Sequence, residues 1–229
     1  MSAAVTTTIS LPDLPVTPVI LEPRRLLGPP DEGALERRVG MGRPFAIRLR
    51  PEKLDRDAAA FVRAEEERAS YYLFTLPVSF YPEAQAPLLS ADLGILLSHD
   101  GAVGEPEPVA WSMSPTQVSS PRRPSTTVTL TARLLFMEAK VSRDIGSEQP
   151  EFFLLGLGEG KSDPEWRFRP TSQQPLVGVH RLSLIVWAPA GVRCAADIRI
   201  GASVRQRKAH LISYRGVLPP EAAHFTFPN

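Results

Sequence analysis

Residues 179–206 decide the fold of this chain, reading VHRLSLIVWA (179–188), PAG (189–191) and VRCAADIRIGASVRQ (192–206). In both longer segments apolar residues occupy every second position, the period of a strand with one buried face. The shared stripe consists of Leu182, Leu184, Val186, Ala188, Val192, Cys194, Ala196, Ile198, Ile200, Ala202 and Val204. The alternation predicts two strands that face a common core.

The connection Pro189-Ala190-Gly191 suits a three-residue hairpin loop. Proline presets φ at the first turn position, and glycine accepts the left-handed conformation that such loops need. We therefore expect a hairpin with both apolar stripes on one face of one sheet. The predicted pairs are Ala188 with Val192, Val186 with Cys194, Leu184 with Ala196 and Leu182 with Ile198.

Length and composition are those of a globular protein. The 229 residues suffice for one sizeable domain or two small ones, and the hydrophobic fraction of 43% is ordinary. The 24 prolines favour a β-rich fold, because proline is excluded from helix interiors. A net charge of +1 favours neither nucleic acid nor an acidic membrane as the partner.

The chain carries no recognisable targeting signal. Its first residues lack a basic region followed by a long apolar run, and no window approaches eighteen uninterrupted apolar residues. We expect a cytoplasmic protein, and the alanine-, arginine- and proline-rich composition suggests a GC-rich bacterial genome. The single cysteine, Cys194, excludes an internal disulfide, and its place in the apolar stripe predicts a buried, inert thiol.

Residues 1–50 are interrupted by prolines and are predicted to be a Pro-rich extension, either disordered or partly docked on its own domain or a neighbouring subunit. Within it, Phe45 to Leu49 fits a short strand. Residues 51–70 predict the one helix, because Pro51 suits a first turn and acidic residues follow it. Its apolar stripe consists of Leu54, Ala58, Phe61 and Val62.

Strand-like alternation recurs after residue 70, with loops too short for crossover helices. The predicted strands cover residues 72–80, 91–97, 109–111, 126–141 (with a bend near 134–137), 152–157, 166–168 and 209–214. Pro77 predicts an edge strand or a bulge in the first of them. We expect a mainly β fold, a two-layer antiparallel β-sandwich or jelly-roll-like domain over residues 51–218. Residues 119–125 are a candidate internal boundary, and residues 219–229 a C-terminal tail.

No catalytic, cofactor-binding or metal-binding residue is predicted. The stretch Gly156 to Ser162 resembles a phosphate-binding loop, but Leu155 stands where the first glycine is needed, and a strand pattern follows instead of a helix. A flexible hairpin loop fits better. The four histidines are scattered without metal-ligand spacing, no Gly-x-Ser-x-Gly elbow is present, and His180 is expected to be half-buried.

Basic residues gather on the outer face of the predicted hairpin. Its register places Arg181 opposite Arg199 and Trp187 opposite Arg193, with Arg205 further along the same surface. From residue 193 to 215 only Asp197 offsets six basic side chains. This face is either a solvated strand surface with one Trp-Arg stack or a binding surface for an anion or an acidic partner.

These observations favour a non-enzymatic interaction or assembly module that binds a protein partner or associates with itself. Such a module needs no cofactor, and nucleic acid is not the expected partner. Two alternatives stay open. One is a membrane-binding or pore-forming β protein, favoured by amphipathic strands of about ten residues. The other is an enzyme whose site is assembled from distant loops on a jelly-roll-like fold.

Overall fold

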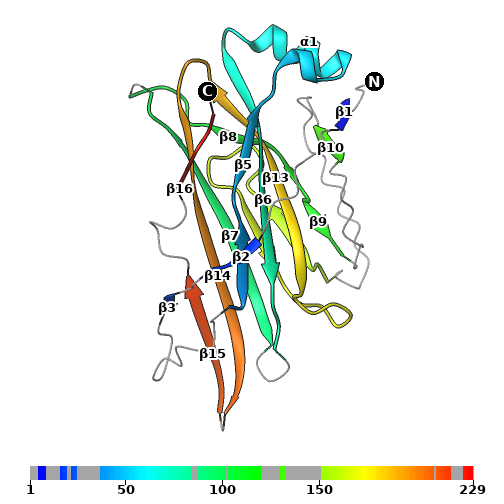
Figure 1. Cartoon of the computed structure of the whole chain (residues 1–229), viewed down its shortest axis with the longest axis vertical. Coiled ribbons are helices and arrows are strands. Elements are labelled where there is room, and N and C mark those ends of the chain that lie inside the picture. The colour runs from blue at the N-terminus through cyan, green and yellow to red at the C-terminus, as the bar shows by residue number, and fades with distance from the viewer. Residues whose placement is uncertain are drawn as a thin grey trace, which may run out of the picture.

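Alternating apolar residues build two antiparallel sheets that pack face to face (Figure 1). The structure is a computed structural model that describes residues 5–8, 16–19, 22–24, 37–83, 87–101, 103–119, 129–132, 151–208, 210–217 and 224–228. Within these ranges the protein is mainly β with one α-helix. The predicted antiparallel β-sandwich with a single helix is therefore confirmed.

The larger sheet has eight strands. Its order is β3 (Glu22–Arg24), β15 (His210–Val217), β14 (Cys194–Lys208), β7 (Leu88–His99), β12 (Glu165–Phe168), β11 (Leu154–Leu157) and β9 (Gln117–Val118). Strand β16 (His224–Thr226) also pairs with β14, beside its first residues. Strand β14 therefore pairs with β7 on one side and with β16 and β15 on the other.

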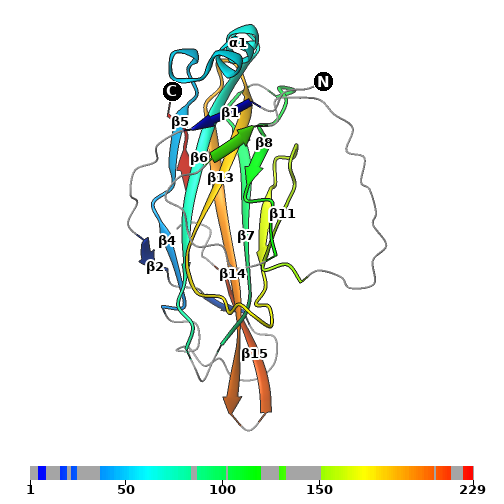
Figure 2. The ribbon, with the colours of Figure 1, turned by 90° about the vertical axis from the view of Figure 1, so that its right-hand side faces the viewer.

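The smaller sheet has six strands and is seen face-on in Figure 2. Its order is β2 (Val16–Pro18), β4 (Val39–Gly42), β6 (Ala69–Phe80), β13 (Gly178–Pro189) and β8 (Val109–Ser114), with β5 (Phe45–Arg48) also paired to β6. A separate two-stranded ribbon joins β1 (Val5–Thr8) to β10 (Thr129–Ala132).

The main core fills the space between the two sheets. Each long strand contributes the alternate residues that its sequence pattern assigns to a buried face, as for Phe74 of β6, Leu93 of β7 and Ile198 of β14. Trp166 and Phe168 of β12 are also completely buried. Burial of these side chains removes a large apolar area from water and is the main favourable contribution to folding.

Strands β13 and β14 do not pair with each other. Along its whole length β13 pairs with β6, whereas β14 pairs with β7 in the other sheet. Val186 lies opposite Tyr72, and Cys194 lies opposite His99. The predicted hairpin register is therefore wrong, although its apolar stripe is buried as expected. The two stripes face each other across the core instead of sharing one face of a sheet.

The connection between these strands is held from both sides. The Ala190 amide donates to the Arg68 carbonyl just before β6, at 3.0 Å. The Arg193 amide donates to the Asp100 carboxylate just after β7, at 2.9 Å. Gly191 has the positive φ of 81° that the turn needs. The Pro-Ala-Gly turn therefore connects two strands of different sheets, although the same sequence would also suit a hairpin within one sheet.

The helix α1 (Arg56–Glu65) covers part of the outer face of the six-stranded sheet. A 3-10 turn, η1 (Pro51–Lys53), precedes it, and the Asp55 side chain caps it by accepting a hydrogen bond from the Ala58 amide at 2.9 Å. Val62 packs against Leu73 and Ile185 in a second apolar cluster. The helix is shorter than predicted, because Pro51 starts the separate turn.

Strand β6 is buried on both faces and is not an edge strand. β5 pairs with its residues 72–75 and β4 with residues 78–80, while β13 runs along the other side without a register shift. Pro77 lies between the part of β6 that pairs with β5 and the part that pairs with β4. Neither strand pairs with Pro77 itself, so on this edge of β6 the missing N–H of proline breaks no hydrogen bond between strands. The predicted edge strand is therefore wrong, whereas the alternative, a bulge, has a counterpart: the register shifts by one residue opposite Pro77, between the pair Met41–Val78 and the pair Phe45–Thr75.

Both predicted terminal extensions contribute to the sandwich. Val39 of β4 is fully buried in the main core, β5 confirms the short strand predicted at residues 45–49, and β2 and β3 pair with strands of the same chain. At the other end, Phe227 enters the core beside β16. Most of the candidate boundary at 119–125 and most of the strand predicted at 126–141 lie outside the described residues.

A buried hydroxyl pair joins β6 to β13. The Thr75 and Ser183 hydroxyls lie 3.2 Å apart on the outer face of the six-stranded sheet, and both residues are buried. Thr75→Val should lower the free energy of unfolding by about 1–3 kcal/mol, because it leaves the Ser183 hydroxyl without this partner. Adding Ser183→Ala should recover part of that loss. Urea unfolding measures both values, and a strictly additive double variant would contradict the pairing.

Candidate interaction surfaces

The structure distributes the predicted binding residues over different parts of the sandwich. Arg181 and Trp187 lie on the outer face of the six-stranded sheet, opposite Pro77 and Tyr71 respectively. Arg199 lies on the outer face of the eight-stranded sheet, opposite Gly94. Arg193 is exposed in the crossing between the sheets, and Arg205 belongs to the last part of β14. No single surface gathers the five.

Two of the predicted contacts are wrong for the same reason. Arg181 and Arg199 are on opposite sides of the molecule, since β13 and β14 lie in different sheets. Trp187 is half-buried in the apolar cluster beneath α1 and pairs with Tyr71 and Val109, not with Arg193. The basic face expected from the hairpin register is not formed.

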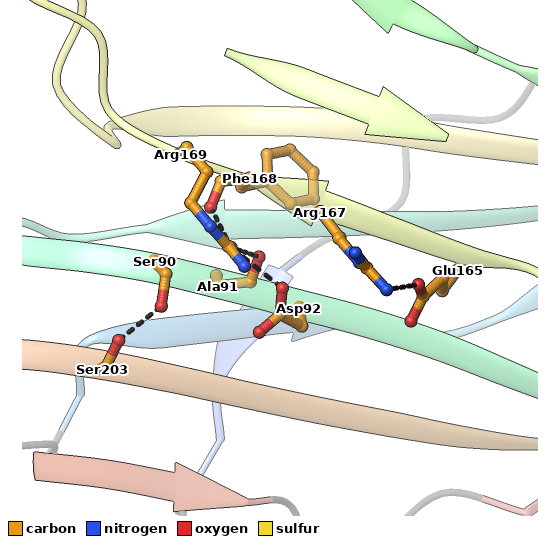
Figure 3. Close-up of polar contacts among 8 residues, drawn as sticks. All are labelled: Ser90, Ala91, Asp92, Glu165, Arg167, Phe168, Arg169 and Ser203. Atoms are coloured by element: carbon orange, nitrogen blue, oxygen red, sulfur yellow. Dashed lines mark hydrogen bonds and ion pairs between the residues drawn. The ribbon is translucent and has the colours of Figure 1, made fainter. Parts of the chain in front are cut away.

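The outer face of the eight-stranded sheet carries a network of exposed ion pairs (Figure 3). Arg169 contacts the Asp92 carboxylate at 2.9 Å and the Phe168 carbonyl at 2.7 Å, and Arg167 contacts Glu165. Ser90 and Ser203 exchange a hydrogen bond between β7 and β14. Because these pairs are exposed to solvent, each contributes little to stability. Both carboxylates are held by arginines, which favours a solvated, structural role for this network.

Arg199 differs from its neighbours on this face. It is exposed, has no ion pair with any residue that the structure describes, and lies across Gly94 from Glu165. The position where Gly94 would carry a side chain is open. The guanidinium is therefore accessible from solvent, but one exposed arginine on a flat sheet does not define a binding site.

His180 sits among aromatic rings where the two sheets meet. Its ring lies 5.5 Å from Phe80, 5.3 Å from Phe153 and 5.4 Å from Phe168, and its Nε2 lies 3.1 Å from the Val177 carbonyl. Burial lowers the pKa of His180, an effect that the hydrogen bond to Val177 opposes. The expected half-buried histidine is confirmed, and its surroundings favour the neutral ring.

This pKa shift predicts a loss of stability in acid. The unfolded chain, with an ordinary histidine pKa of 6.5, takes up the proton before the folded protein does. The contribution of neutral His180 is complete above pH 6.5 and is lost as the pH falls from 6.5 toward the folded pKa. Urea unfolding should show that the free energy of unfolding falls less between pH 7.5 and pH 5 for His180→Gln than for the wild type. An equal fall in the free energy of unfolding for both proteins would contradict a lowered pKa at His180.

The single thiol and the glycine-rich loop carry no site chemistry. Cys194 is buried, and burial followed by the nearby Asp100 raises its pKa to about 11, so the reactive thiolate is scarce at neutral pH. Gly158 and Gly160 have positive φ in the turn between β11 and β12, which pair antiparallel. The predicted hairpin loop at residues 156–162 is therefore confirmed, and no helix follows it.

A cavity of about 270 Å³ lies beside α1, at the end of the sandwich that carries the helix. Its polar lining combines two arginines, Arg48 and Arg50, with two glutamates, Glu52 and Glu66. Tyr71 also lines it, and burial followed by Glu65 raises the pKa of Tyr71 to about 12, which keeps its hydroxyl protonated. The lining includes neither histidine nor cysteine, and the mixed charges favour no one ligand class.

The described residues contain no cluster of three or more histidine, cysteine or acidic side chains that could hold a metal ion. In the same part of the chain no helix is long and apolar enough to cross a membrane.

The most distinctive feature of the strand pairing is the end of the β14–β15 hairpin, here named the hairpin arm and defined as residues 205–214. β7 pairs with β14 only as far as Val204, and β3 pairs with β15 only from Arg215. Between these points β14 and β15 pair with each other alone among the described residues. Figures 1 and 2 show this ribbon extending past the other labelled strands at the end opposite α1.

The sequence contains one signal for this arm. Its residues include Arg205, Arg207 and Lys208 but no aspartate or glutamate. In the structure, β14 has 15 residues and its neighbour β7 has 12, so β14 continues after β7 ends. The basic run is visible from composition, whereas the projection depends on which strand pairs with β14. The comparison with models of known protein families finds no match, and the comparison with curated proteins finds none either.

Proposed function

We propose that this protein is a non-enzymatic interaction module, a β-sandwich that binds a protein partner or a second copy through its hairpin arm. The observation that carries the proposal is the arm's backbone, whose two outer edges have no strand partner among the described residues. Unpaired strand edges accept an extended segment of another chain by backbone hydrogen bonds. We place this module in the cytoplasm of a bacterial cell.

The charge of the arm supports an acidic partner. Arg205, Arg207 and Lys208 lie within four consecutive residues of β14, and His210 opens β15. Positive charge along an open edge attracts acidic segments and repels basic ones, which gives specificity to an interaction that backbone hydrogen bonds alone would not discriminate. The near-neutral chain and the scarcity of aromatic residues beside these cations favour a protein over a nucleic acid.

Site-specific photocrosslinking tests the proposal. A photoreactive amino acid at position 206 or 212 should form adducts with another protein chain in the cells that produce the protein. The same amino acid at Gln173, exposed in the connection between β12 and β13, is the matched control and should form far fewer. Equal adduct yields at the arm and at position 173 would overturn the arm as the interaction element.

A further inference from the structure

The acidic counterpart of the hairpin arm lies on the same chain, at the opposite end of the sandwich. The loop between β7 and β8 includes Glu105 and Glu107, which are exposed, and Val103 at its tip is fully exposed. No lysine or arginine occurs between His99 and Trp111. Residues 103–107 are named here the acidic loop. They are separated from the arm by the length of β14, because His99 pairs with Cys194 and Leu88 with Val204.

From these placements we infer that the hairpin arm of one copy docks on the acidic loop of a second copy, so that the protein associates head to tail. This inference rests on the proposed function and names the partner. The arm and the acidic loop lie at opposite ends of a strand of about 50 Å, so neither can reach the other within one copy. Contacts between unlike ends are heterologous, and each added copy leaves one free arm and one free loop.

The acidic loop presents carboxylates, not a strand. Residues 103–105 form a turn and a bend, and both Glu105 and Glu107 are exposed. Docking therefore rests on the charges of the loop and on the backbone edges of the arm, which are unpaired among the described residues. The two glutamates then meet a strand that carries Arg205, Arg207 and Lys208.

Charge reversal at each end tests this docking. Sedimentation velocity of the wild type at low salt should show a mass that rises with protein concentration and falls when salt is added. Arg205→Glu with Arg207→Glu in the arm, or Glu105→Lys with Glu107→Lys in the loop, should each weaken association by roughly tenfold or more. Mixing the two reversed proteins should restore it, because each then offers the charge that the other lacks.

Arg199→Glu is the matched control, since it reverses an exposed arginine on the outer sheet face away from both ends and should leave association unchanged. Circular dichroism and thermal unfolding show whether each variant keeps its fold. A wild type that stays monomeric at every concentration would overturn self-docking, as would association that survives either reversal or is not restored by mixing. Adducts from position 206 to a different protein would then still support the proposed function, whereas their absence would count against both.

Discussion

Trp166→Ala should lower the free energy of unfolding by about 3–5 kcal/mol, a large part of the 5–15 kcal/mol typical of a domain. Trp166 is completely buried in β12, and its Nε1 donates to the Pro115 carbonyl at 2.9 Å. The substitution removes the largest buried side chain of the core and leaves a cavity between the sheets. It also leaves the carbonyl without that donor.

Urea unfolding followed by circular dichroism measures the loss. Trp166→Phe separates packing from hydrogen bonding, because it keeps most of the apolar volume and removes only the N–H donor, so its cost should be clearly smaller. Arg167→Ala, at the neighbouring exposed position, is the control and should change stability by less than about 1 kcal/mol. A Trp166→Ala protein as stable as Arg167→Ala would mean that β12 does not close the core.

Phe227→Ala should destabilise the protein by a similar amount, about 3–5 kcal/mol. Phe227 is almost completely buried, although only two residues follow it in the sequence. Its ring stacks on Phe74 at 5.6 Å and meets Tyr72 edge-on at 5.3 Å. Pairing of β16 with β14 holds it there, and the Phe227 amide donates to the Cys194 carbonyl at 2.9 Å.

The matched control for this prediction is Thr226→Ala on the same short strand. Thr226 is exposed, and surface substitutions of this kind usually change stability by no more than about 0.5 kcal/mol. Thermal unfolding of the two variants gives the comparison directly. If both variants unfolded at the same temperature as the wild type, residues 224–228 would not contribute to the core, and the C-terminal tail predicted at residues 219–229 would be the better description.

Alternation in the sequence identified the buried faces but not the partners of the strands. Leu184 and Ala196 are buried as predicted, yet they belong to different sheets. A hairpin and a crossing between sheets bury the same residues, and the Pro-Ala-Gly turn suits both. The difference depends on the competing partners β6 and β7, which lie about a hundred residues earlier in the chain. Local patterns carry no information about that choice.

The same ambiguity explains what happened to the predicted binding face. Arg181 and Arg199 share a surface only if β13 pairs with β14. Because β13 pairs with β6 and β14 pairs with β7, that surface is not formed. The basic character of residues 205–208 did not depend on pairing and therefore remains in the proposal. Phe227 was missed because a short segment beyond two prolines contains too few residues to show a period.

The central claim is that β13 and β14 lie in different sheets. This placement puts Arg181 and Arg199 on opposite outer faces, and it pairs β14 with β7, past which β14 continues into the hairpin arm. Pulsed electron–electron double resonance tests this claim by measuring the distance between spin labels attached at Arg181→Cys and Arg199→Cys in a Cys194→Ala background. Sheets packed about 10 Å apart, with one label on each outer face, predict a separation of roughly 20 Å or more. If β13 and β14 paired in one sheet, the two labelled residues would be cross-strand neighbours about 5 Å apart, and the labels would be in direct contact. That result would contradict the fold and the interaction surface derived from it.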